Sequence, residues 1–85
     1  MAQDEREVVL KSVSLNVKLT AEGTERLSHI RDRIKATSFA QTVRESFRVF
    51  DIVTEMLSNG ETLLVQGKDG KIEKLNFGLN IALKN

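Results

Sequence analysis

The chain of 85 residues contains no cysteine, no proline, no tryptophan and no tyrosine. Without cysteine, a disulfide framework and a thiolate metal site are both excluded. No apolar run approaches the length that crosses a bilayer, and the first seven residues, M-A-Q-D-E-R-E, are acidic and unlike a signal peptide. We therefore expect a soluble, cytoplasmic protein with no membrane partner.

The groups that catalysis needs are also scarce. His29 is the single histidine, so neither a catalytic triad of plausible order nor a histidine metal site can be assembled, and we expect it to lie on the surface. There is no glycine loop that would cradle a phosphate and no carboxylate pair in an apolar setting. We expect a protein that is not an enzyme and that uses no metal and no cofactor.

The net charge is only +1, and no segment is strongly basic. Binding to nucleic acid would therefore depend on a few well-placed groups and would be sensitive to salt. The chain is one small domain, and at 40% apolar residues its core is thin. Oligomerisation is a reasonable expectation for a chain of this size.

The most informative stretch is V-S-L-N-V-K-L, residues 13–19, in which apolar and polar residues alternate. Alternation at period two predicts a strand, here over about 11–19, with one buried and one solvated face. The solvated face carries Ser14, Asn16 and Lys18, whose side chains are of the kinds that bond to base edges. Since a lone strand is unstable, it requires a partner strand from elsewhere.

Two helices are predicted after this strand. The first is expected over 21–35, with Thr20 as its N-cap and an apolar stripe of Leu27, Ile30 and Ile34. The second is expected over 39–59, where Ser38 and Gln41 have the spacing of a capping box and Asn59-Gly60 is a stop signal. Its apolar face is wide for a small monomer, which suggests contact with a second copy: Val43, Phe47, Phe50, Val53 and Leu57.

The tail resembles a β-hairpin in pattern. Asp69-Gly70 lies between two strand-like runs and is a signal for a type I′ turn. Residues 79–83 are expected to add a short strand or to pack on a partner. The chain is thus divided into a flexible arm (1–10), a strand-helix-helix domain (11–60) and a C-terminal hairpin extension (61–85).

The order of these elements resembles the Arc/MetJ-type ribbon-helix-helix family. The resemblance covers about 11–57 and rests on L-N-V-K-L-T (15–20) and S-F-A-Q-T-V-R-E-S-F (38–47), in which Ser38, Val43 and Arg44 fit the motif S-x-x-x-x-[IV]-R. The resemblance implies an α+β, mostly α fold. It also implies an intertwined homodimer in which one strand from each chain pairs antiparallel with the other. Gly23-Thr24 departs from the family, which often has two apolar residues there.

The resemblance also implies a function. In this family the paired ribbon enters the major groove of double-stranded DNA. Carried over, the base-reading residues are Ser14, Asn16 and Lys18, and the phosphate-binding amides at the second helix are those of Thr37, Ser38 and Phe39. The expected protein is a sequence-specific transcriptional regulator, a repressor that acts as a dimer or as dimers side by side on DNA.

Three alternatives remain open. An antitoxin would bind its own operator through the same module and a toxin through its C-terminal region, although a folded hairpin argues against the unstructured tail usual in antitoxins. A relaxosome accessory protein would use the same DNA chemistry. An interaction protein without a DNA role would bind through the 61–85 hairpin, and the low net charge is the best support for it.

Overall fold

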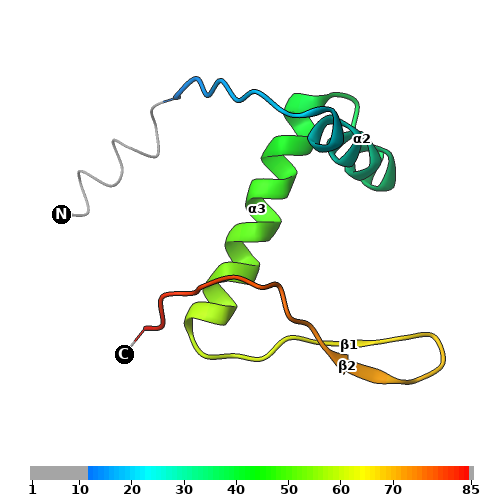
Figure 1. The fold of residues 1–85 in the computed structure, drawn as a ribbon, viewed down its shortest axis with the longest axis vertical. Coiled ribbons are helices and arrows are strands. Elements are labelled where there is room, and N and C mark those ends of the chain that lie inside the picture. The colour runs from blue at the N-terminus through cyan, green and yellow to red at the C-terminus, as the bar shows by residue number, and fades with distance from the viewer. Residues whose placement is uncertain (1–11, 85) are drawn as a thin grey trace.

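The computed structural model describes residues 12–84, which form an α+β, mostly helical fold. Its elements, in chain order, are the helices α2 (Ala21–Ile34) and α3 (Phe39–Ser58) and the strands β1 (Leu64–Gln66) and β2 (Ile72–Lys74). Figure 1 shows α2 beside the first turns of the long α3, with the hairpin at the opposite end. The expected arm of residues 1–10 and the first residue of the predicted strand lie outside the described residues.

Helix α2 begins where the sequence predicts. The hydroxyl of Thr20 accepts a hydrogen bond of 3.0 Å from the N–H of Gly23, as an N-cap does. The helix ends one residue earlier than expected because Lys35 adopts a left-handed conformation, with φ 57° and ψ 37°. In this conformation the N–H of Ala36 donates to the carbonyl of Arg31 at 3.0 Å, which closes the last turn.

Helix α3 also begins as predicted, after Ser38, and it ends at Ser58 with Asn59 as its C-cap. Gly60, with φ 83°, then turns the chain away from the helix axis, and the N–H of Glu61 donates to the carbonyl of Met56. The Asn59-Gly60 stop signal is thereby confirmed.

The strand predicted over 11–19 is not formed within the single chain. Residues 12–20 carry no regular secondary structure and run as an open segment into α2 (Figure 1). Among the described residues there is no neighbouring strand to complete its hydrogen bonds, and the sequence itself predicts that the partner comes from elsewhere.

The C-terminal hairpin is confirmed, with β1 and β2 antiparallel and Val65 opposite Glu73. Its turn is not type I′, because that turn needs positive φ at both central residues and Asp69 lacks it. Instead the N–H of Gly67 donates to the carbonyl of Lys71 at 2.8 Å across a three-residue loop. Gly70 closes that loop with φ 84°, the pattern of a turn followed by a left-handed bulge residue.

Residues 79–83 do not form a strand, which corrects the first of the two expectations for them. After Gly78, the chain crosses the last turns of α3 (Figure 1). The N–H of Lys84 donates to the carbonyl of Ser58 at 2.8 Å, and its Nζ lies 3.2 Å from Oε2 of Glu55. These two contacts join the end of the described chain to the end of α3, and the sheet keeps two strands.

Within residues 12–84 no apolar side chain is fully buried, and Thr42, at 0% exposure, is the single buried residue. The single chain therefore lacks the buried core that a stable domain requires.

No helix among the described residues combines the length and the apolar character needed to cross a membrane.

Candidate nucleic-acid interface

The three predicted base-reading residues lie on the open segment that precedes α2. Ser14, Asn16 and Lys18 are all exposed. The apolar residues that alternate with them are exposed as well, from 85% at Val13 to 49% at Leu19. Neither face of the segment is covered, so the apolar face that the alternation predicts to be buried has no covering in the single chain.

The segment is joined firmly to α2 at its last residue. A Cβ built on Gly23 would lie 3.6 Å from Cβ and 3.7 Å from Cδ2 of Leu19. Leu19 therefore packs over the first turn of the helix, in the space that a side chain at position 23 would share. At these distances a Cβ at position 23 would make ordinary van der Waals contacts, so the structure gives no steric reason for the glycine where the resemblance leads us to expect an apolar residue.

The start of α3 carries the predicted phosphate-binding residues Thr37, Ser38 and Phe39. The hydroxyl of Ser38 accepts from the N–H of Gln41 at 3.1 Å, which is one half of the predicted capping box; the other half, from the N–H of Ser38 to the side chain of Gln41, is not formed. The side-chain oxygen of Gln41 accepts from both the N–H and the hydroxyl of Thr37, each at 2.9 Å. The Thr37 amide is therefore already engaged, and it is not free to bind an anion as the sequence interpretation assumes.

Three successive amides at this helix end remain available. Among the described residues, no acceptor is recorded for the N–H groups of Ser38, Phe39 and Ala40. There is no acidic residue in the first turn of α3, so no carboxylate neutralises the positive end of the helix dipole. Free amides and an unopposed dipole are the two features that make a helix N-terminus bind anions.

A cation lies beside the same helix end. The guanidinium carbon of Arg31, on α2, lies 4.9 Å from the centre of the Phe39 ring, within the range of a cation–π contact. The same side chain donates to the hydroxyl of Ser28 at 3.3 Å and lies 3.5 Å from Asp32. These contacts hold Arg31 near the start of α3, and the carboxylate of Asp32 offsets part of its charge.

Sequence reasoning missed Arg31 and Ala40. Ala40 follows directly from counting the N–H groups that a helix leaves unbonded at its start. Arg31 carries no signal of its own in the sequence, because its contact with Phe39 depends on how the 35–38 connection folds α2 back onto α3. The expected surface position of His29 is confirmed.

The open segment and the start of α3 lie at the same end of the molecule, whereas the hairpin lies at the other end (Figure 1). The candidate base-reading and phosphate-binding groups are thus brought to one end by the α2–α3 arrangement. In the part of the chain that the structure describes, no cluster of His, Cys, Asp and Glu has the make-up of a metal site.

Comparisons with models of protein families, with curated proteins and with solved structures find no match to this chain.

Proposed function

We propose that the protein is a sequence-specific DNA-binding transcriptional regulator, a repressor that acts as a homodimer. Two copies of the 13–19 segment pair antiparallel into a ribbon, and this ribbon enters the major groove. A two-stranded ribbon fits that groove, where each base pair presents its own pattern of donors and acceptors.

The exposed alternation of residues 13–19 carries this proposal. Four apolar side chains at every second position, exposed by 49–85%, form a face that needs a cover. A second copy supplies both the missing strand and the missing core. Within residues 12–84 no apolar side chain is buried in the single chain, so the core has to come from association.

Sequence discrimination is assigned to Ser14, Asn16 and Lys18. An amide such as that of Asn16 can bond to adenine in two places, and the ammonium of Lys18 can bond to guanine. Each contact occurs twice in a symmetric dimer, which favours a palindromic site. A good contact of this kind contributes about 1–3 kcal/mol of discrimination.

The start of α3 fixes the position of the protein along the DNA. A backbone phosphate would accept hydrogen bonds from the amides of Ser38, Phe39 and Ala40, with Arg31 beside it. Such contacts orient a protein on the duplex without reading its sequence. Because they are made by backbone groups and one arginine, they compensate for the low net charge of the chain.

Selection of duplexes from a random pool tests the proposal. Wild type should enrich a single palindromic sequence, whereas Asn16→Ala and Lys18→Ala should relax the preference at their own base pairs. Lys68→Ala is the matched control for Lys18→Ala, because it removes the same charge from the hairpin loop, away from the candidate interface.

If wild type enriches no sequence, the regulator function is wrong. If Asn16→Ala and Lys18→Ala both enrich the wild-type sequence, as Lys68→Ala should, the assignment of base reading to the ribbon is wrong. A preparation in low salt gives an early indication, because a chain without Trp or Tyr absorbs weakly at 280 nm and bound nucleic acid would dominate at 260 nm.

The hairpin favours a second candidate, an interaction protein without a DNA role. Leu64 and Ile72 are exposed by 62% and 61% on a short hairpin, as a surface that binds another protein would be. An antitoxin would combine this surface with DNA binding. Loss of a partner in the double variant Leu64→Ser/Ile72→Ser, with DNA binding unchanged, would identify the hairpin as the protein-binding element.

A further inference from the structure

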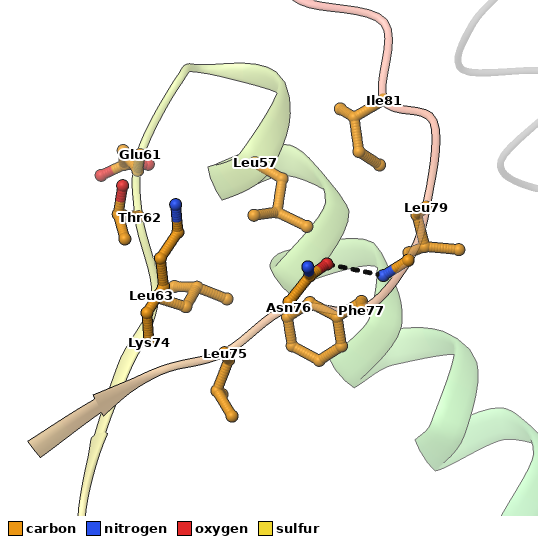
Figure 2. A pocket seen from close by; sticks show the side chains of 11 residues that line it. Leu57, Glu61, Thr62, Leu63, Lys74, Leu75, Asn76, Phe77, Leu79 and Ile81 are labelled. Atoms are coloured by element: carbon orange, nitrogen blue, oxygen red, sulfur yellow. Dashed lines mark hydrogen bonds between the residues drawn. The ribbon is translucent and has the colours of Figure 1, made fainter.

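Phe77, in the C-terminal segment, lines two cavities. Phe77 lines a small cavity of about 270 Å³ under the hairpin together with apolar residues of α3 and the tail, namely Leu57, Leu63, Leu75, Leu79 and Ile81 (Figure 2). It also lines a larger open groove of about 670 Å³, which is bordered by α2 and α3. Phe77 therefore lies between the apolar residues of the tail and the exposed apolar face of α2 and α3.

The larger groove is mainly apolar and is open to solvent. Ile34 of α2 and Val49, Phe50 and Val53 of α3 line it, and Ile34, Val49 and Phe50 are each exposed by 46–50%. The ring of Phe77 is 43% exposed. Exposed apolar side chains gathered in one groove are a surface of the kind that binds another molecule.

The tail is held in place at both sides of Phe77. Before it, the N–H of Leu75 donates to the carbonyl of Leu63 at 2.9 Å, which extends the hairpin. After it, the side-chain oxygen of Asn76 accepts from the N–H of Gly78 at 3.0 Å, and Gly78 takes φ 67° (Figure 2). With Lys84 bonded to the end of α3, these contacts fix the ring beside the helix.

We propose that the occupant of this groove is α3 of a second copy of the chain, and that Phe77 contacts it directly. The C-terminal extension would thereby be part of the dimer interface rather than a separate appendage. The inference rests on the proposed homodimer. A second copy is favoured because no apolar side chain within residues 12–84 is buried in the single chain, and because the groove is continuous with the apolar face of α3.

The dimer dissociation constant, measured by sedimentation equilibrium with interference optics, tests this. We expect Phe77→Ala to raise the constant by at least about 30-fold, the effect of losing an aromatic residue at the centre of an interface. Leu79→Ala is the matched control, because Leu79 is 44% exposed, lies two residues away and lines the small cavity but not the groove. Leu83→Ala controls for loss of an exposed apolar residue of the tail.

A labelling experiment avoids any dependence on how well Phe77→Ala folds. The chain has no cysteine, so Phe77→Cys and Leu83→Cys each introduce a single thiol. When the protein concentration is raised from below to above the dimer dissociation constant, the thiol at position 77 should react more slowly with a thiol reagent. The thiol at position 83 should keep its reaction rate.

The outcomes separate the two proposals. A chain that stays monomeric at every concentration overturns the homodimer and this inference together. A dimer that Phe77→Ala weakens no more than Leu79→Ala does overturns the inference alone, as does a labelling rate at position 77 that does not change on dimerisation. In either of those cases the tail packs on its own helix and the partner contacts lie elsewhere.

Discussion

The side-chain oxygen of Gln41 accepts two hydrogen bonds from Thr37, one from its N–H and one from its hydroxyl. With the Ser38 cap, this arrangement fixes the connection between α2 and α3. Gln41→Ala should lower the free energy of unfolding by about 1 kcal/mol, as loss of a capping interaction does. Gln41→Glu keeps the acceptor, so its stability in denaturant titrations should be close to that of wild type.

The variants Gln41→Ala and Gln41→Glu also distinguish an effect on folding stability from an effect on DNA binding. Gln41→Glu places a negative charge beside the free amides of Ser38, Phe39 and Ala40. If a DNA phosphate binds to these amides, the affinity of the Gln41→Glu variant for DNA should fall although the variant remains stable. Equal DNA affinity of Gln41→Glu and wild type at low salt would contradict the phosphate assignment.

Arg31 should contribute to DNA binding in a way that does not depend on sequence. In a dimer, Arg31→Gln removes two charges near the phosphates, so the slope of log affinity against log salt should become shallower by about 2. Arg33→Gln loses the same charge from the same helix at an exposed position and is the control. Identical slopes for the two variants would show that Arg31 makes no phosphate contact.

Lys35 is the single non-glycine residue with positive φ among the described residues. A left-handed conformation costs an L-residue about 1–2 kcal/mol, while glycine brings extra flexibility to the unfolded chain. Lys35→Gly should therefore stabilise the protein by up to about 1 kcal/mol in thermal unfolding. Lys35→Ala removes the same side chain and keeps the Cβ, so it should give no such gain.

The midpoint of thermal unfolding should rise with protein concentration. Within residues 12–84 no apolar side chain is buried, so in the proposed dimer the core would form on association. Stability is then coupled to the concentration of the protomer. Differential scanning calorimetry over a hundredfold range of concentration would reveal the shift, and a constant midpoint would argue for a folded monomer.

Local signals in the sequence predicted the helices well. Thr20 and Ser38 cap their helices with their own side chains, and Asn59-Gly60 ends α3, because these effects act within a few residues. The hairpin was predicted from Asp69-Gly70, but its turn type was wrong, since a dipeptide does not determine how many residues the loop contains.

Features that depend on distant parts of the chain could not be predicted. The contact of Arg31 with Phe39 joins two helices, and the position of Phe77 depends on the path of the whole tail. For Ser14, Asn16 and Lys18, the sequence predicts an exposed polar face, and the structure places all three residues in solvent. What those residues contact stays a prediction, because the proposed partner strand would come from another molecule.

The missing core has a consequence for how such a regulator would respond to its own gene dosage. If folding requires two chains, the amount of folded protein at low expression follows the square of the chain concentration. Halving expression would then lower the folded pool roughly fourfold, and the unpaired chains would be open to proteolysis. A promoter under its control would accordingly be released sharply as the cell dilutes the protein by growth.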